Sequence, residues 1–381
     1  MAVRGWTVAV LWVAMVGILA AQADPDAVKK LLDQMGIAST PTKRGQADVV
    51  GFASRAGQMD AVLQQTAELA APQAAMLEKQ NGWTAETAFA AAVCPHDDYY
   101  YAARLYGLAL PHVKAPRVIL FGVFHKARLF DCRDKLVFDK FAEWRAPYGL
   151  VPVSPLRQEL QAKLPAGDWV ADNAMHSVEH SLEAIVPYLQ AYRRDVEIVP
   201  ILVPYMDWET MDRLAADFAA ALAAVMKEKG WVLGRDVAVV CSTDAVHYGD
   251  SQWGGTNYCP FGSDAAGYLK AVTQDRSLIE HFLAGPVKPE KLKDFLYLCV
   301  DPKDVTRYTI TWCGRFSVPF GLLAAQRAAR ALGRPDLNGV LLDYGTSVSE
   351  ASLDLAGLGL MGQTAPNNLH HWVGYAALGY E

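Results

Sequence analysis

The sequence predicts an α/β fold in which a mostly parallel central sheet is covered by helices on both faces. Stretches of nearly uninterrupted apolar sequence, such as 117–123 and 236–242, are typical of parallel strands that are buried on both sides. These stretches alternate with segments of helical periodicity, which is the order in which a chain builds βαβ units. No internal repeat or low-complexity segment interrupts the alternation.

The predicted elements follow one another from residue 48 onward. The apolar stretches predict strands over 88–94, 117–123, 196–204, 236–242 and 339–345. Helical spacing of apolar residues predicts helices over 60–69, 99–110, 181–192 and 211–228. We therefore expect one α/β domain over 48–381, preceded by a polar extension over 24–47.

The amino terminus has the features of a secretory signal peptide over 1–23. The basic Arg4 precedes an uncharged apolar stretch, and Ala21-Gln22-Ala23 forms a small-x-small cleavage site before the polar chain begins. The apolar stretch is shorter than the ~20 residues needed to cross a bilayer. We expect cleavage after Ala23, export to the periplasm or the extracellular space, and no stable membrane insertion of the mature chain.

Composition argues against nucleic acid as a partner and does not determine whether disulfides form. The formal net charge is −6 and the sequence contains no cluster of basic residues, so nucleic acid is not an expected partner. Cys94 and Cys241 lie within predicted strands, where buried free thiols are expected. A bridge among Cys132, Cys259 and Cys299 stays open, as does the oligomeric state.

Three histidines and a cysteine follow stretches of strand-like sequence: His96, His125, His247 and Cys313. Ligands of open α/β sheets bind at the carboxyl ends of the strands, and imidazole with thiolate is a metal-binding combination. His125 follows His96 by 29 residues, close to the ~30 residues of a βαβ unit, so we expect both at one edge of neighbouring parallel strands. Each histidine alone is as well explained by a hydrogen bond at a strand end; together they favour a site.

Two further pairs combine an imidazole with a carboxylate. Glu183 lies one helical turn beyond His180 and either holds a substrate, orients the histidine for acid–base work, or caps a helix. Asp244 precedes His247 by three residues and either fixes its tautomer or caps a turn. Ser242 is not part of a G-x-S-x-G elbow, which disfavours serine hydrolase chemistry.

Several short motifs in a fixed order carry a resemblance to a known family. They are Pro95-His96-x-x-Tyr99, the strand-end His125, and the stretches HSLEAIVPYL (180–189), STDAVHYG (242–249), WCGRF (312–316), DYGTSVS (343–349) and VGYAALGYE (373–381). The chain resembles the Memo-like family, called AmmeMemoRadiSam system protein B in bacteria, from about residue 48 to the end. That family is similar in fold to class III extradiol ring-cleavage dioxygenases, whose non-haem iron is held by two histidines and a carboxylate.

The resemblance implies a site in which a cysteine takes the place of that carboxylate. The implied metal ligands are His96, His125 and Cys313. The implied catalytic residues lining the pocket are His180, Asp244 and His247. A single metal ion is expected, iron(II) or copper, with zinc as a further candidate.

The first motif departs from the family pattern, because Pro-His-Ala-Gly-Tyr is Pro-His-Asp-Asp-Tyr here. The added Asp97 and Asp98 offer carboxylates near the first histidine, one of which could replace the cysteine as third ligand. We assign Asp98 to the substrate pocket, together with Tyr99 and Glu183.

Two functions follow from this interpretation. The first is an exported, metal-dependent oxidoreductase of extradiol dioxygenase type. The second is a protein without catalysis that binds a small molecule, a peptide or copper in a vestigial dioxygenase pocket. Metal-assisted hydrolysis ranks last, because no H-E-x-x-H motif supports it.

Overall fold

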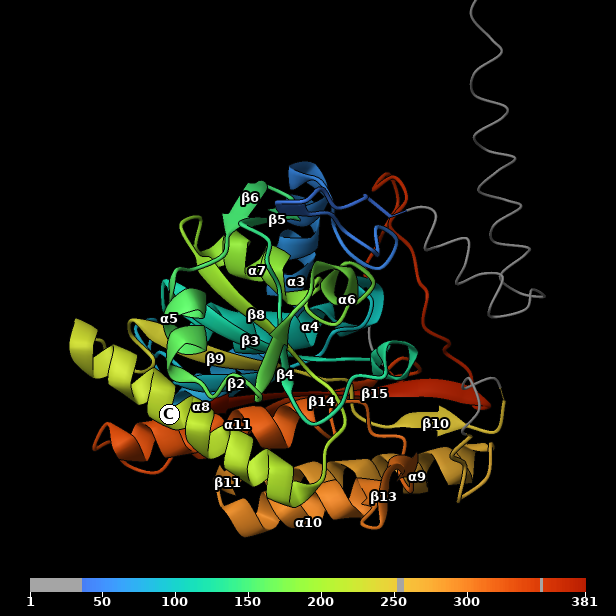
Figure 1. The fold of residues 1–381 in the computed structure, drawn as a ribbon. Coiled ribbons are helices and arrows are strands. Elements are labelled where there is room, and N and C mark those ends of the chain that lie inside the picture. The colour runs from blue at the N-terminus through green and yellow to red at the C-terminus, as the bar shows by residue number, and fades with distance from the viewer. Residues whose placement is uncertain (1–35, 252–256, 350–351) are drawn as a thin grey trace, which may run out of the picture.

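A computed structural model describes residues 36–251, 257–349 and 352–381 of the chain. These residues form an α/β structure around one large sheet (Figure 1), which confirms the predicted class. Its strands lie in the order β11-β14-β15-β2-β9-β3-β8-β4-β7, and β10 pairs with β15 beside that path. The signal peptide predicted over 1–23 lies outside the described residues, as does the extension before residue 36.

Four parallel strands form the middle of the sheet: β2 (Ala91–Cys94), β9 (Val237–Ser242), β3 (Arg117–Val123) and β8 (Glu197–Val203). Their side chains are almost all buried, because helices cover both faces of the sheet. This burial explains why their sequences read as continuous apolar stretches.

The sheet is mixed, so the expectation of a mostly parallel sheet holds only for its middle. On one side lie β15 (His371–Tyr380), β14 (Asn338–Thr346) and β11 (Gly285–Pro286), paired antiparallel, with β10 (His247–Gly249). On the other side β4 (Leu136–Phe138) runs antiparallel to β8 and parallel to β7 (Trp169–Ala171). An apolar stretch shows that a strand is buried but not its direction, which is why the sequence did not reveal the mixture.

Helices pack on both faces of this sheet (Figure 1). One face carries α3 (Ala56–Asn81), α4 (Tyr99–Ala109) and α7 (Ile185–Tyr192), and the other carries α8 (Trp208–Lys229) and α11 (Ser317–Ala331). The remaining helices are α5 (Leu156–Lys163), α6 (Asn173–Ser177), α9 (Ala265–Leu278), α10 (Pro289–Cys299), η1 (Leu110–His112), η2 (Ala127–Phe130) and η3 (Ile279–Leu283). No helix in the described ranges is both long and apolar enough to cross a bilayer.

The chain also forms two small sheets. One consists of β1 (Lys43–Arg44), β5 (Glu143–Ala146) and β6 (Gly149–Pro152), and the other of β12 (Val300–Asp301) and β13 (Asp304–Tyr308).

Helix ends follow local chemistry where the sequence supplies it. Asp207 caps α8 by accepting the backbone N–H of Thr210 at 2.8 Å, and Gly230 ends that helix with φ 67°. The helix predicted over 181–192 begins only at Ile185, because residues 181–184 form a turn held by tertiary contacts. One of them is the Ser181 hydroxyl, which donates to the carbonyl oxygen of Val123 at 2.7 Å.

All six cysteines are free, so the bridge left open among Cys132, Cys259 and Cys299 is not formed. Cys94 and Cys241 are fully buried thiols within β2 and β9, as expected.

The order of the central strands corrects one expectation about the site. β2 and β3, which precede His96 and His125, are not neighbours, because β9 lies between them and pairs with both. The connection from β2 to β3 therefore skips one strand position in the sheet, and β9 occupies that position. As a result, the loop after β9, with Asp244, reaches the same edge between the two histidines.

Candidate metal centre

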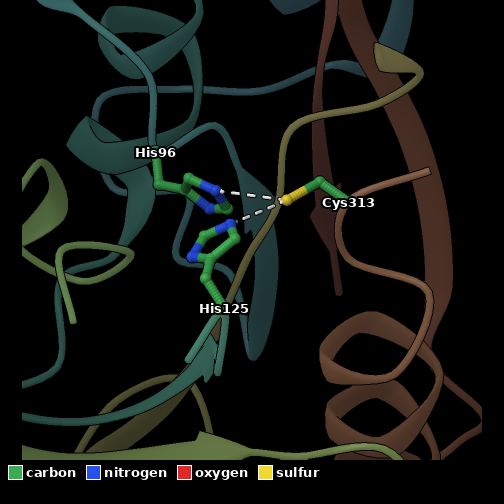
Figure 2. Close-up of side chains that lie close together, drawn as sticks. All are labelled: His96, His125 and Cys313. Atoms are coloured by element: carbon green, nitrogen blue, oxygen red, sulfur yellow. Dashed lines mark hydrogen bonds between the residues drawn. The ribbon is translucent and has the colours of Figure 1, made fainter. Parts of the chain in front are cut away.

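His96, His125 and Cys313 meet at the carboxyl edge of the central strands. Figure 2 shows both imidazole rings pointing toward the sulfur. The Cys313 Sγ lies 3.4 Å from His96 Nε2 and 3.2 Å from His125 Nε2. Three distant segments of the sequence thus deliver one ligand-type atom each, and all three atoms lie within 4.8 Å of one another.

Cys313 reaches the histidines because its loop packs closely on the end of β9. The backbone N–H of Cys313 donates to the carbonyl oxygen of Ala245 at 3.1 Å. A Cβ atom at Gly314 would lie 2.1 Å from Thr243 Oγ1, so only glycine permits this approach.

The His96 ring is oriented by two serines. Its Nδ1 lies 2.7 Å from the Ser242 hydroxyl, whose own hydrogen is donated to the carbonyl oxygen of Ser181. The hydroxyl therefore accepts from the ring, which assigns the proton of His96 to Nδ1. The lone pair of Nε2 then faces Cys313.

The His125 ring is oriented by Glu179, a residue that the sequence interpretation missed. The Glu179 carboxylate accepts the ring Nδ1–H at 2.9 Å, the backbone N–H of His125 at 2.7 Å and that of Ser181 at 3.0 Å. Burial opposes the charge, but His125, His180 and these hydrogen bonds prevail and lower the pKa of Glu179 to about 2. The available signal was the adjacent pair Glu179-His180, which places an acid beside the family's histidine motif.

The Asp244 carboxylate lies closer to the His96 ring than to the His247 ring. It accepts the backbone N–H of His96 at 3.0 Å, and its Oδ2 lies 3.2 Å from His96 Nε2 but 3.9 Å from His247 Nε2. Burial raises the pKa of Asp244 to about 7, so this group lies near its titration midpoint at neutral pH. The carboxylate that was predicted to fix the tautomer of His247 therefore lies within 4 Å of the Nε2 atoms of two rings.

The other two predicted catalytic histidines border the same cluster. The His180 ring stacks on His125, with centroids 4.9 Å apart and planes inclined by 6°. Burial, together with the charges of nearby residues, lowers the pKa of His247 to about 3 and keeps its imidazole neutral.

The donor set fits a metal ion. Ligand atoms bound at ~2.0 Å (nitrogen) and ~2.3 Å (sulfur) in tetrahedral geometry lie roughly 3.5 Å apart, close to the two distances found here. Both Nε2 atoms face the sulfur at short distance, so one further atom placed among the three would be in reach of each of them. Within the described residues, two overlapping groups could also hold an ion: His125-Glu179-His180 and Asp244-His247-Cys313.

Comparison with known proteins identifies the family. The family model for Memo-like proteins matches residues 52–359. The chain belongs to this family. A MEMO1 family protein of Aquifex aeolicus is 28% identical over 260 residues, which cover 68% of this chain and 78% of that protein. A Pyrococcus abyssi relative is 31% identical over 180 residues, covering 45% of this chain and 56% of its own. One from Methanosarcina barkeri is 32% identical over 162 residues, covering 41% and 54% respectively.

The three residues assigned to a substrate pocket have other partners in this Memo-like chain. The Glu183 carboxylate is buried against the Arg44 guanidinium and accepts the backbone N–H groups of Ala47 and Asp48 at 2.6 and 2.8 Å. These contacts hold the segment before the family domain in place. The helical spacing to His180 was misleading because residues 181–184 are not helical.

Asp98 and Tyr99 likewise serve the fold. The Asp98 carboxylate accepts the backbone N–H groups of Thr364 and Ala365 and thereby ties a distant loop to the start of α4. Tyr99 is fully buried among aromatic rings, and its hydroxyl donates to the carbonyl oxygen of Ala184 at 2.6 Å. These polar contacts of both side chains are made to residues outside the three-residue cluster.

A cleft of about 190 Å³ opens beside the cluster. His125 and Cys313 line it, and the other lining residues include Phe124, Arg128, Tyr308 and Arg315. The side chain of His125 keeps 27% of its surface exposed. The cleft therefore offers a route from solvent to two of the three candidate ligands.

Proposed function

We propose that this Memo-like chain is an exported, mononuclear metal-dependent oxidoreductase of extradiol dioxygenase type. The observation that carries the proposal is the pair of imidazoles whose Nδ1–H groups are both engaged, by Ser242 and by Glu179, while both Nε2 atoms face Cys313. Carboxylate or hydroxyl partners of this kind orient histidine ligands and tune the metal. The relation to class III extradiol dioxygenases is part of the proposal.

Iron(II) and copper are the metals that we propose for this set. Imidazole suits iron, copper and zinc, and thiolate selects copper(I) and zinc. When bound, iron or copper would supply redox chemistry together with Lewis-acid activation of an oxygen-bearing substrate.

The chain's own groups would handle the proton. Asp244 lies beside His96 and is suited to accept a proton from a substrate hydroxyl and to return it. His247 beside it is neutral and can hold the hydroxyl by a hydrogen bond. The stacked His180 would restrict the position of the His125 ring.

The metal assignment is tested by elemental analysis of the natively purified protein. The His96→Ala variant is expected to lose stoichiometric metal while keeping the wild-type circular dichroism spectrum. The matched control is His370→Ala, since this exposed histidine pairs with Asp250 away from the cluster. Unchanged metal content in His96→Ala would refute the assignment.

A binding protein without catalysis is the second candidate function, with a small molecule, a peptide or copper as its ligand. It is favoured by Cys313, because a cysteine sulfur stands where ring-cleavage enzymes carry a carboxylate. Oxygen uptake by the iron-loaded protein over a broad panel of catechols separates the two functions. Uptake supports the oxidoreductase, and its absence with metal bound supports the binding protein.

We also propose that the protein is exported, because residues 1–23 have the features of a signal peptide. Amino-terminal sequencing of the protein secreted by its host is expected to begin at Asp24. A mature chain that still starts at Met1 would remove this part of the proposal.

A further inference from the structure

Arg44 lies before the range that the family model matches, yet the structure buries it to 2% exposure. It belongs to β1, which pairs parallel with β5 and places Arg44 opposite Trp144. The guanidinium carbon lies 4.2 Å from the centroid of the Trp144 ring, within the range of a cation–π contact. Glu183 supplies the opposite charge. The ring and the carboxylate together hold the guanidinium in one position.

The Arg44 guanidinium also donates to two backbone carbonyl oxygens at and just beyond the carboxyl end of α6. Its Nε donates to the carbonyl oxygen of His176 at 3.0 Å, and its Nη2 donates to that of Glu179. Arginine side chains commonly bond the last carbonyl groups of a helix. Because the guanidinium is planar and rigid, it also fixes the spacing of the two oxygens. Arg44 therefore restrains the main chain of the turn over 176–179.

That turn leads directly into the residues that orient both candidate histidine ligands. The Glu179 carboxylate accepts the Nδ1–H of His125 at 2.9 Å. The carbonyl oxygen of Ser181 accepts the Ser242 hydroxyl, which in turn accepts the Nδ1–H of His96. Both rings are thus oriented from residues 179 and 181, whose main chain Arg44 restrains at residue 179.

Arg44 and its ion-pair partner Glu183 differ in the segments that they reach. The Glu183 carboxylate accepts the backbone N–H groups of Ala47 and Asp48, which belong to the amino-terminal segment. Arg44 reaches out of that segment to residues 176 and 179. A substitution of Glu183 therefore breaks the ion pair and leaves both carbonyl bonds in place, whereas a substitution of Arg44 removes the ion pair and the carbonyl bonds together.

We infer that Arg44 is a positioning residue for the candidate metal centre. It acts through the main chain of residues 176–179 and thereby keeps the Glu179 carboxylate on the ring of His125. A displaced carboxylate would leave this ring without the partner that sets its orientation and basicity. The effect of Arg44 on metal affinity rests on the proposed function; its effect on the ring of His125 does not.

Cobalt(II) is the probe for metal affinity, measured by competition with a chromogenic chelator. Arg44→Gln is expected to bind cobalt about tenfold more weakly than the wild type, at the lower end of what partners of metal ligands contribute. Glu183→Gln is the matched control, because it breaks the same ion pair and keeps the carbonyl bonds; its affinity is expected to stay within about twofold of the wild type. The double variant Arg44→Gln/Glu183→Gln leaves neither charge uncompensated and carries the test if Arg44→Gln does not fold.

NMR spectra of the histidine ring nitrogens in the metal-free proteins give a second readout, which a loss of stability alone does not move. The signals of His125 are expected to shift in Arg44→Gln and in the double variant, and to stay at their wild-type positions in Glu183→Gln. His370 provides the reference signals, since it is exposed and pairs with Asp250.

The two readouts separate this inference from the proposed function. Wild-type cobalt affinity in the folded Arg44 variants, or an equal loss in Glu183→Gln, would overturn the inference alone. Unchanged His125 signals in the folded Arg44 variants would overturn it as well. If the wild type itself binds no cobalt, the proposed metal function fails, and a shift of the His125 signals in the Arg44 variants would still support the positioning of that ring.

Discussion

Single carboxylates in this protein have distinct tasks that their residue type does not reveal. Glu179 and Glu183 stand four positions apart and are both buried. Glu179 is bonded to the ring of His125, and Glu183 is bonded to Arg44. The first therefore acts on the candidate metal centre and the second on the attachment of the amino-terminal segment.

The Glu179→Gln variant is expected to bind metal 10- to 100-fold more weakly than the wild type. The loss of the carboxylate removes the charge that orients His125 and raises its basicity, and partners of this kind contribute about that much to metal affinity. Competition with a chromogenic chelator measures the change. Wild-type affinity in this variant would show that Glu179 does not support the ligand.

The Glu183→Gln variant is expected to lose stability but to keep the metal affinity of the wild type. Removing one partner of a buried ion pair leaves Arg44 uncompensated, which costs about 3 kcal/mol of the free energy of unfolding. Urea unfolding measures this loss. The folded variant should bind metal with unchanged affinity, and a loss of affinity larger than that of Glu179→Gln would contradict the assignment of the two residues.

At the scale of elements, the site depends on close approach between the loop before α11 and the end of β9. Gly314 permits this approach, because a Cβ atom there would lie 2.3 Å from the Cβ of Thr243. The loop brings Cys313 to the two histidines, which follow β2 and β3. The position of the sulfur thus depends on packing between elements, which the adjacent Gly314 permits.

The Gly314→Ala variant is expected to weaken metal binding by tenfold or more and to lower the free energy of unfolding by about 1–3 kcal/mol. The added methyl group must push the loop away from Thr243, as overpacking does elsewhere. Gly57→Ala is the matched control, because a Cβ atom there meets open space at the start of α3. Equal effects of the two substitutions would rule out the close approach as the cause.

At the scale of the whole molecule, Asp275 connects the sheet to the helices around the site. Its carboxylate accepts from Trp312 Nε1 and from the Tyr344 hydroxyl, both at 2.8 Å, and from the backbone N–H of Val246 at 3.3 Å. The bonds join α9, the loop that carries Cys313, β14 and the segment before β10. Burial prevails over them and raises the pKa of Asp275 from 3.8 to about 6.

This pKa predicts a pH-dependent contribution to stability. Between about pH 4 and pH 6 the folded protein binds more protons at Asp275 than the unfolded chain does. Its contribution to the free energy of unfolding therefore falls as pH rises through this window, by on the order of 3 kcal/mol, and changes little above or below it. Urea unfolding of the wild type and of Asp275→Asn is expected to show a difference that shifts by this amount. Parallel curves would contradict the assignment.

The sequence by itself determined the α/β class, the four buried central strands and the family, because burial on both faces leaves long apolar stretches and short motifs recur in order. It also pointed to His96, His125 and Cys313 as residues at strand ends. Only the tertiary structure decided that β9 lies between β2 and β3, that Glu179 holds His125, and that Glu183, Tyr99 and Asp98 serve the fold. Strand order and side-chain partners depend on contacts between residues far apart in the chain, which local periodicity and spacing do not encode.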